Sequence, residues 1–375
     1  MSRSLTIVKI DGKPGQVYYP LQLNTNPKPV PGPGELLIRL HATALNHRDH
    51  FIRQHLYPGL SFDNALLADG SGNVVEAGPG SGTALLHQRV ILTPMRSWAP
   101  TSPSPSSLPP LSSSSGANPL ANWIAIGGIT QYAAGAAQDY ICVPESEVEA
   151  CPAHLSAAEA AALPLVGLTG WRALVSKGGC EKGQNVLVTG IGGGVALAVL
   201  QFGVAMGANV YVTSGSQEKL DKAKALGAAG GVSYKEAGWE KKLAGLLPES
   251  RPYLDIVVDG AGGDIVSKTV RLLKPNGVIA IYGMTVAPKM EWSMQAVMKN
   301  VDLRGCTMGS RDEFRDMVAF VREHGVRPVV SRVVRGLDNL DGIDGLFADM
   351  RDGRQFGKLV IEIAPESEGE AGSKL

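Results

Sequence analysis

The 375-residue chain has few cysteines, few aromatic residues, no excess charge of either sign and no long apolar run. Its four cysteines stand singly, without a C-x-x-C pair, which excludes a disulfide framework and indicates a reducing compartment. Lys and Arg balance Asp and Glu at 35 each, so the composition shows neither the basic surplus of a nucleic-acid binder nor an acidic solvating tract. The longest apolar stretch, residues 195–206, is interrupted by Gln201 and is shorter than the roughly 20 residues that cross a bilayer. The first residues lack the apolar run of a signal peptide, so we expect a soluble protein.

Glycine, in contrast, is abundant, with 46 residues against a norm of roughly 7%. Together with 44% hydrophobic residues, this predicts a turn-rich α/β protein of two or three domains. The N-terminal part reads as short strands at residues 36–40 and 72–76, with a further strand at 139–143. Ser and Pro dominate residues 99–119, so we expect an exposed insertion loop within 97–130.

From residue 156 the pattern becomes an alternation of helices and buried strands. Ser156 followed by Glu159 predicts a capped, alanine-rich helix. Apolar runs predict strands at 185–189, 209–213, 255–259 and 278–282, and helical patterns include 217–226 and 265–273. This alternation predicts a doubly wound parallel sheet, followed after about residue 311 by two helices and a last strand at 358–363.

A glycine-rich turn follows the first of these strands and leads directly into an apolar helix. Its residues are Gly190, Gly192, Gly193, Gly194, Val195 and Ala196, with the spacing G-x-x-G-x-x-A for 190, 193 and 196. Glycines let backbone N–H groups approach a pyrophosphate, and the N-terminus of the helix favours its negative charge. The alternative is a tight structural turn, but the strand-turn-helix context predicts a dinucleotide site.

The end of the next strand indicates which dinucleotide is bound. An acidic residue there would accept the ribose hydroxyls of NAD, but this strand ends in Thr213 and Ser214. Small hydroxyls and a lysine leave room for a phosphate, so Ser214, Ser216, Lys219 and Tyr234 are candidate ligands of the 2′-phosphate of NADP(H). The alternative is that Lys219 is only a solvated helix lysine.

Six segments together resemble a known family. They are 44–49 (Ala-Leu-Asn-His-Arg-Asp), 69–74 (Asp-Gly-Ser-Gly-Asn-Val), 167–174, the glycine turn, 259–263 and 356–358. In order and spacing they resemble the medium-chain dehydrogenase/reductase superfamily, in its zinc-independent quinone oxidoreductase and enoyl reductase branch. The resemblance implies a GroES-like substrate domain from residues 1–152 and 311–375, and a Rossmann NADP-binding domain from 153–310. It also implies an active site in the cleft between them and a homodimer formed through the Rossmann edge strand.

The zinc ligands of related dehydrogenases are missing from the matching positions. Relatives with a catalytic zinc have Cys where this chain has Asn46-His47, and His-Glu where it has Ala68-Asp69. The four cysteines of a structural zinc lobe are replaced by the Ser/Pro-rich insertion. Because Zn²⁺ requires thiolate and imidazole ligands in tetrahedral spacing, we expect no metal.

Candidate catalytic residues are Asn46, His47 and Tyr57. Asn46 matches the asparagine that lies near the nicotinamide in quinone oxidoreductases, and Tyr57 aligns by spacing with the proposed proton donor of mitochondrial-type enoyl reductases. A phenol can donate to an enolate oxygen or to carbon. In the alternative interpretation, Asp49 only caps a helix and Tyr57 only packs beneath the cleft.

The resemblance adds further cofactor contacts by position, each of which has an equal alternative as a turn or core residue. They are Thr169, Ala261, Tyr282, Met284, Met308, Ser310 and Lys358.

The expected function is NADPH-dependent transfer of hydride to an activated C=C bond in an enone, quinone or enoyl thioester, without zinc. The alternatives are metal-free carbonyl reduction or alcohol oxidation, and a non-catalytic dinucleotide-binding role. The sequence ends in Ser373-Lys374-Leu375, the tripeptide read by the peroxisomal import receptor, after a flexible Gly/Glu/Ser stretch. We therefore expect a peroxisomal protein, with the cytoplasm as the alternative, and a small-molecule substrate without nucleic-acid or membrane partners.

Overall fold

The computed structural model describes residues 1–96 and 124–365, so most of the Ser/Pro-rich insertion and the C-terminal tripeptide lie outside the described residues. The chain forms two compact units, Met1–Leu165 with Ser310–Leu375, and Val166–Gly309. The sequence predicted that the first unit ends at residue 152 and resumes at residue 311. The structure differs mainly at the first of these boundaries, because the first unit continues to Leu165. Residues up to Leu165 stay with the first unit because helix α2 (Ala157–Ala162) packs against four strands of its sheet, β3, β4, β18 and β19.

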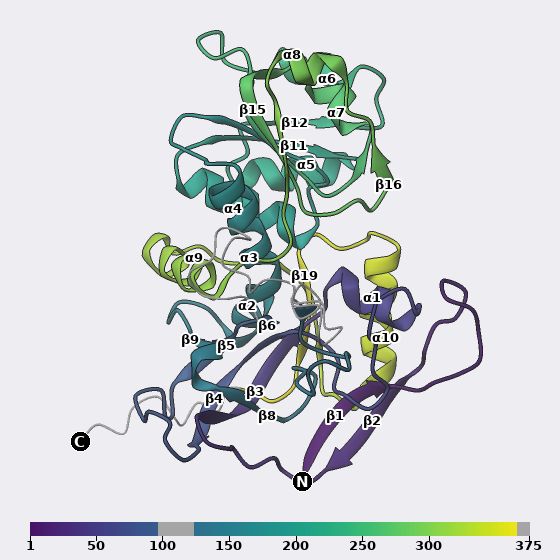
Figure 1. The fold of residues 1–375 in the computed structure, drawn as a ribbon, viewed down its shortest axis with the longest axis vertical. Coiled ribbons are helices and arrows are strands. Elements are labelled where there is room, and N and C mark those ends of the chain that lie inside the picture. The colour runs from purple at the N-terminus through teal and green to yellow at the C-terminus, as the bar shows by residue number, and fades with distance from the viewer. Residues whose placement is uncertain (97–123, 366–375) are drawn as a thin grey trace, which may run out of the picture. The chain divides into compact units, whose positions relative to one another are not determined.

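The first unit is built on a seven-stranded sheet with the order β18-β19-β3-β4-β5-β9, where β8 also pairs with β3 (Figure 1). The strands are β3 (Glu35–Ala44), β4 (Asp69–Ala77), β5 (Arg89–Leu92), β8 (Tyr140–Pro144), β9 (Val148–Ala150), β18 (Val330–Arg335) and β19 (Lys358–Glu362). Smaller two-stranded sheets are formed by β1 (Ser2–Ile7) with β2 (Leu21–Asn26), and by β6 (Met95–Arg96) with β7 (Ile124–Ala125). Leu36, Ile38 and Leu40 of β3 alternate into the core, as the period of a strand requires.

Four α-helices lie in the described part of this unit: α1 (His47–Arg53), α2, α9 (Arg311–His324) and α10 (Leu340–Arg351). The predicted start of α2 is confirmed, since the Ser156 side chain accepts a hydrogen bond from the Glu159 backbone and the Glu159 carboxylate accepts one from Ser156. Two helices after residue 311 are also confirmed. Helix α9 buries Phe314, Val318 and Val321 on one face, which is the spacing of an amphipathic helix.

The second unit is a parallel six-stranded sheet with the order β12-β11-β10-β13-β15-β17. Its strands are β10 (Asn185–Val188), β11 (Asn209–Ser214), β12 (Gly230–Ser233), β13 (Leu254–Asp259), β15 (Leu273–Ile281) and β17 (Asp302–Gly305), and a short pair is formed by β14 (Gly262–Gly263) and β16 (Ala287–Met290). The helices are α3 (Pro164–Trp171, with a π-helical continuation at Arg172–Lys177), α4 (Gly194–Ala205), α5 (Gln217–Ala225), α6 (Trp239–Ala244), α7 (Ile265–Thr269) and α8 (Met294–Met298). The doubly wound sheet expected from the sequence is confirmed, and the fully buried β10 and β13 explain the unbroken apolar runs.

One predicted helix is shorter than its sequence pattern. The pattern favoured a helix over residues 265–273, but α7 ends at Thr269 and Leu273 already belongs to β15. The Thr269 hydroxyl donates to the carbonyl of Ile265, and the amide of Leu254 donates to the carbonyl of Leu272, so strand pairing takes over where the helix would continue. Pairing with β13 therefore prevailed over local helix propensity.

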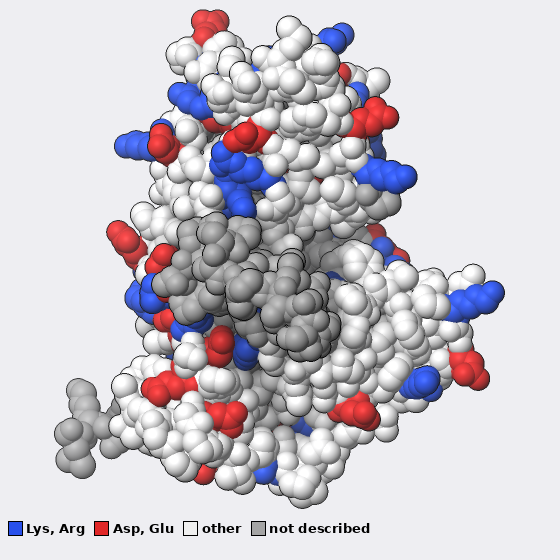
Figure 2. Space-filling view, in the orientation of Figure 1, with Lys and Arg blue, Asp and Glu red and all other residues white. Residues whose placement is uncertain are grey.

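The surface shows no dominant charge on the face drawn in Figure 2, where acidic and basic side chains are interspersed. In residues 1–96 and 124–365, no helix has both the length and the hydropathy needed to cross a membrane.

Candidate dinucleotide site and a buried polar network

The glycine turn lies at the carboxyl end of β10, where the strand order of the second unit reverses between β10 and β13. Gly190 and Gly192 have φ of +66° and +121°, which disfavour any side chain. The backbone amide of Gly190 donates to the Thr213 hydroxyl at 3.2 Å, and that of Ile191 to the Thr213 carbonyl at 2.8 Å. Gly193 then precedes the first residue of α4. A topological switch point beside a helix N-terminus is the place where doubly wound folds bind a dinucleotide.

Four of the predicted glycine-turn residues form the start of helix α4. Gly193 is the N-cap of α4, and Gly194, Val195 and Ala196 form its first turn. The Ala196 side chain is completely buried, in keeping with its expected role in close packing of helix and strand.

Lys219 lies directly beside this turn. A Cβ added to Gly192 would be 2.9 Å from Cδ of Lys219 and 3.3 Å from its Nζ, so the lysine side chain runs along the turn. Partial burial lowers the pKa of Lys219. The structure therefore joins the predicted phosphate ligand and the predicted glycine turn, and places a cation where an anion would bind.

The remaining candidate ligands of a 2′-phosphate surround Gly215, just after β11. A Cβ at Gly215 would lie 2.7 Å from the Tyr234 hydroxyl and 2.7 Å from Cε of Lys235. The Ser214 hydroxyl accepts a hydrogen bond from the backbone of Ser216 at 3.2 Å. The sequence analysis missed Lys235; its position next to Tyr234, directly after a strand, was the available signal.

Ser216, a candidate ligand of the 2′-phosphate, is also the N-cap of α5. Its hydroxyl accepts a hydrogen bond from the backbone amide of Lys219 and caps α5. A hydroxyl that accepts at a cap keeps its own proton to donate elsewhere.

A second group of contacts lies at the carboxyl ends of β10 and β13. The Thr189 hydroxyl donates to Oδ1 of Asp259 at 2.5 Å, and the amide of Gly262 donates to Oδ2 at 2.7 Å. Burial raises the pKa of Asp259. This carboxylate ties β10 to β13 and to the loop that carries Ala261, whose carbonyl accepts from Val286 at 2.9 Å. Asp259 was part of the resemblance but was not singled out as a functional residue.

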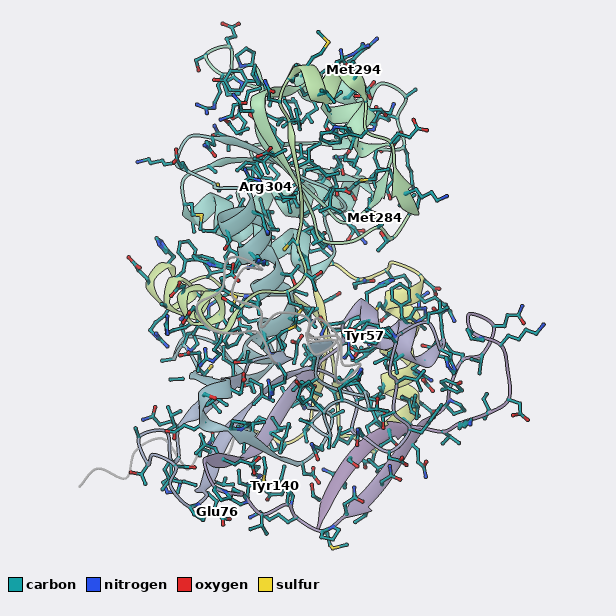
Figure 3. The ribbon with its side chains drawn as sticks, viewed as in Figure 1. Tyr57, Glu76, Tyr140, Met284, Met294 and Arg304 are labelled. Atoms are coloured by element: carbon teal, nitrogen blue, oxygen red, sulfur yellow. The ribbon has the colours of Figure 1, made fainter. Side chains whose placement is uncertain are left out.

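Tyr282 and Met284 follow β15. The Tyr282 ring lies against Gly260, where a Cβ would be 2.5 Å away, and burial raises the pKa of its phenol. Met284 is 41% exposed (Figure 3). Of these two predicted residues, therefore, only Met284 is broadly accessible.

Thr169 and Met308 come together within the second unit. The Thr169 hydroxyl lies 3.5 Å from the sulfur of Met308, and the thiol of Cys306 donates to the Thr169 carbonyl at 3.7 Å. Ser310 falls in the first unit, where its hydroxyl accepts from Glu313 and caps α9.

In the first unit, a buried network surrounds Asn46. Lys358 Nζ donates to Oδ1 of Asn46 at 2.6 Å, to Oδ2 of Asp69 at 2.9 Å and to the Leu45 carbonyl at 2.7 Å. Asn46 Nδ2 also donates to Oδ2 of Asp69 at 2.9 Å, and the backbone amide of Leu165 donates to Oδ1 at 2.8 Å. Asp69 is fully buried and Lys358 is 5% exposed. The structure thus unites two predicted residues and adds Asp69, which the sequence analysis placed in the family resemblance and at a position where relatives have a zinc ligand, but did not single out as a functional residue.

A second buried carboxylate lies at the start of α1. Oδ2 of Asp49 accepts from the Asn46 backbone at 2.7 Å, and Oδ1 accepts from Arg48 at 3.1 Å. Burial raises the pKa of Asp49 to about 6, although Arg48, the Asn46 hydrogen bond and Lys358 all act against this rise. The helix-capping alternative for Asp49 is therefore part of the structure.

Arg48 connects this carboxylate with Tyr57. Its guanidinium donates to the carbonyls of Ile126 and Gly127 at 2.9 and 2.8 Å, and its Cζ lies 4.5 Å from the centre of the Tyr57 ring. Tyr57 is half-buried against the core, and its hydroxyl makes no hydrogen bond within the described part of the chain (Figure 3). The phenol is thus held by the packing of its ring.

His47 is exposed at the start of α1, with its ring edge-on to Phe51 at 4.8 Å. Desolvation by the surrounding protein lowers the pKa of His47.

Comparison with known proteins identifies the family. Residues 32–153 match the alcohol dehydrogenase GroES-like domain, and residues 194–323 match the family described as zinc-binding dehydrogenase. A zinc-type alcohol dehydrogenase-like protein, YogA, from Leptosphaeria maculans is 58% identical over 97% of this chain and 100% of its own length. A 2-methylene-furan-3-one reductase from Solanum lycopersicum is 28% identical over 64% of this chain and 55% of its own length.

Solved structures agree with this assignment. An NAD-dependent alcohol dehydrogenase is 29% identical, with a TM-score of 0.79 over 96% of this chain and all of the other. A crotonyl-CoA carboxylase/reductase, AntE, in complex with NADP shares the fold at 20% identity, with a TM-score of 0.79 over 98% and 95% of the two chains. The chain belongs to the medium-chain dehydrogenase/reductase superfamily, a class of oxidoreductases, as its motifs indicated.

The zinc that the family description implies does not fit the described residues. Lys358 places its own positive charge against Asp69, both carboxylate oxygens of Asp69 already accept hydrogen bonds, and Asn46 offers an amide in place of a thiolate. Nowhere in residues 1–96 and 124–365 do three His, Cys, Asp or Glu side chains come together in a way that fits a metal ion. A zinc site is built from several thiolate, imidazole or carboxylate ligands in a tetrahedral arrangement, and the network around Asn46 offers only the Asp69 carboxylate, which is already paired with Lys358.

Proposed function

We propose that the protein is an NADPH-dependent, zinc-independent reductase of C=C bonds activated by a carbonyl group. The observation that carries the proposal is the glycine turn at the switch point with Lys219 along it and Tyr234 and Lys235 around Gly215. Two lysines and several hydroxyls, with no carboxylate at the end of β11, favour a phosphate over a free ribose hydroxyl.

The kind of substrate is proposed from the first unit and from one relative. The tomato relative is named a reductase of 2-methylene-furan-3-one, a compound that carries an exocyclic C=C bond conjugated to a carbonyl group. The first unit offers hydrogen-bond donors, the Asn46 amide and the Tyr57 phenol, and no described cluster that fits a metal ion. Donors of this kind stabilise the oxygen of an enolate, whereas the oxidation of a simple alcohol is usually assisted by a Lewis acid.

The residues would share the reaction as follows. When bound, NADPH supplies the hydride, which adds to the β-carbon of the substrate. The electron pair of the C=C bond moves to the carbonyl oxygen, where Asn46 donates a hydrogen bond. Tyr57 donates a proton to the α-carbon or to the enolate oxygen, and solvent restores its proton. The overall change consumes NADPH and one proton and yields NADP⁺ and the saturated carbonyl compound.

The test follows deuterium from 4-deuterated NADPH into a panel of enones and quinones and into the corresponding saturated ketones. Deuterium on the β-carbon supports conjugate reduction. Deuterium on the carbinol carbon would move the proposal to metal-free carbonyl reduction. Tight NADPH binding without incorporation into any member of the panel would favour the non-catalytic dinucleotide-binding alternative. Activity that survives exhaustive chelation would support zinc independence.

The proposal includes a homodimer formed through β17. This strand pairs with β15 on one side, and within the described residues no strand pairs with its other edge. Leu303 of β17 is 44% exposed, and Met294 (Figure 3) and Met298 of α8, the helix that precedes β17 in the chain, are 71% and 77% exposed. If two copies paired antiparallel around Leu303, Asp302 of each would face Arg304 of the other, so the edge is complementary to itself.

The peroxisomal address at Ser373-Lys374-Leu375 stays a prediction from the sequence, with the cytoplasm as its alternative.

A further inference from the structure

Two neighbours determine the orientation of the Asn46 amide, because one of them can only donate hydrogen bonds and the other can only accept them. An ammonium group has three donors and no acceptor, and an ionised carboxylate only accepts. Lys358 Nζ lies 2.6 Å from one end of the amide, and Oδ2 of Asp69 lies 2.9 Å from the other. The end facing Lys358 must therefore be the oxygen, and the end facing Asp69 must be the nitrogen.

Within the described residues, every side-chain N–H donor of this network has an acceptor except one. All three N–H groups of Lys358 are donated, to Leu45, Asn46 and Asp69. Oδ1 of Asp69 accepts from the backbone of Leu165, and Oδ2 accepts twice. Within the described residues, the second N–H of the Asn46 amide has no acceptor.

Asn185 shows what a purely structural asparagine looks like in the same protein. Its Nδ2 donates twice, to the carbonyls of Arg251 and Tyr253 at 2.8 Å each, and its Oδ1 accepts from Asn209 at 3.0 Å. Both amide protons are used there. Asn46 is also buried, at 4% exposure against 0% for Asn185, but within the described residues one of its two amide protons has no acceptor. A buried donor without a partner destabilises the fold unless a ligand accepts from it.

We propose that Lys358 and Asp69 are positioning residues that lock the Asn46 amide so that it presents a single N–H donor to the carbonyl oxygen of a ligand. An amide in the opposite orientation would present its oxygen and repel that carbonyl. The ligand is therefore recognised as a hydrogen-bond acceptor, and the carbonyl belongs either to the substrate or to the carboxamide of the nicotinamide. The activity part of this inference rests on the proposed function, whereas the binding part does not.

Binding is tested by NMR on the full chain labelled with ¹⁵N at asparagine, with the Asn46 amide assigned from the spectrum of Asn46→Asp. The probes are NADPH, 2′-phospho-ADP-ribose, which lacks the nicotinamide, and 2-cyclohexen-1-one added with NADP⁺. We expect one of the two Asn46 amide protons to shift downfield and the Asn185 protons to stay unchanged. A shift with NADPH but not with 2′-phospho-ADP-ribose identifies the carboxamide, and a shift that needs the enone identifies the substrate. If neither Asn46 proton shifts with any probe, the inference is overturned.

The locking role is tested with a matched pair of variants at one position. Asp69→Glu keeps a side chain that only accepts, whereas the isosteric Asp69→Asn introduces an amide that can donate, and so removes one of the two neighbours that fix the orientation of Asn46 and leaves Lys358 alone to hold it. We expect kcat/KM for the enone to fall on the order of 10- to 100-fold in Asp69→Asn, with the loss in kcat, and to change much less in Asp69→Glu. In the NMR experiment the single shifted proton should be lost in Asp69→Asn and retained in Asp69→Glu. Equal losses in both variants would overturn the locking role. A wild-type protein that reduces no enone would contradict the proposed function and leave the NMR result to decide this inference.

Discussion

The ammonium of Lys358 lies 2.9 Å from the carboxylate of Asp69, and both side chains are almost completely buried in the first unit. The two residues are far apart in the sequence, at the start of β19 and the start of β4. A buried ion pair is strongly coupled because each charge, left alone, would have to be desolvated without compensation. Both members are therefore expected to matter for stability as well as for the orientation of Asn46.

Removal of one partner of this pair should destabilise the protein more than removal of both. Lys358→Met leaves Asp69 as an uncompensated buried charge and should lower the free energy of unfolding by about 3–5 kcal/mol. Asp69→Asn combined with Lys358→Met removes both charges and should recover a large part of that loss. Urea unfolding followed by circular dichroism measures both variants at neutral pH. A double variant as unstable as Lys358→Met would show that the two charges are not coupled.

Cofactor preference should depend on the lysine beside the glycine turn. Lys219→Ala should weaken NADPH binding about 10- to 100-fold, equivalent to the roughly 1.5–3 kcal/mol of a hydrogen bond between charged groups, and should affect NADH far less. Lys224→Ala, an exposed lysine later in the same helix, is the matched control. Titration of nucleotide fluorescence with both cofactors gives the dissociation constants. Equal losses for NADPH and NADH would place Lys219 away from the 2′-phosphate.

The buried Asp49 should make stability fall as the pH rises between about 4 and 6. Its pKa is raised from 3.8 to about 6 in the folded state, so the folded chain binds the proton more tightly than the unfolded chain in this window. The stabilisation from the bound proton is complete below the unfolded pKa and is lost as the pH rises through the folded pKa. The loss is about 3 kcal/mol, at roughly 1.4 kcal/mol per pKa unit.

The check compares wild type with Asp49→Asn by urea unfolding at several pH values from 4 to 7. Loss of the hydrogen bonds to Arg48 and to the Asn46 backbone shifts the variant by a constant amount, so the informative quantity is the change of the difference with pH. A difference that is constant from pH 4 to 7 would contradict a raised pKa at Asp49.

Tyr57→Phe isolates the phenolic hydroxyl from the packing of the ring. The ring stays against the Arg48 guanidinium, so folding and NADPH affinity should be retained. If the phenol donates the proton, single-turnover reduction of the enone should slow by roughly 100-fold or more. Thermal unfolding and NADPH titration serve as controls. A rate within a few-fold of wild type would leave Tyr57 with packing alone.

The proposed dimer predicts a charge-reversal cycle at β17. Arg304→Asp places like charges opposite each other in an antiparallel pair and should weaken self-association. Asp302→Arg combined with Arg304→Asp restores opposite charges across the interface and should restore the dimer. Sedimentation velocity at several concentrations measures the populations. A wild-type protein that sediments as a monomer, or a double variant no more associated than Arg304→Asp, would contradict pairing through this strand.

Several elements of the fold could be predicted from short stretches of sequence. The capping box at Ser156, the glycine turn and the buried strands β10 and β13 follow from residues adjacent in the chain, and each was predicted. The same local reasoning predicted that α7 continues past Thr269. This was wrong because Leu273 pairs with β13, and a local sequence pattern does not show which distant strand will pair with it.

The sequence by itself determined the superfamily, the class of fold and the place of the dinucleotide turn, since all three depend on spacings of a few residues. Tertiary structure alone decided what surrounds Asn46. Lys358 was expected to face the cofactor, which stays a prediction, and the fold brings its ammonium to Asn46 across 312 positions of sequence. No local pattern shows such a contact, because it arises only when β19 pairs with β3 and closes the sheet of the first unit.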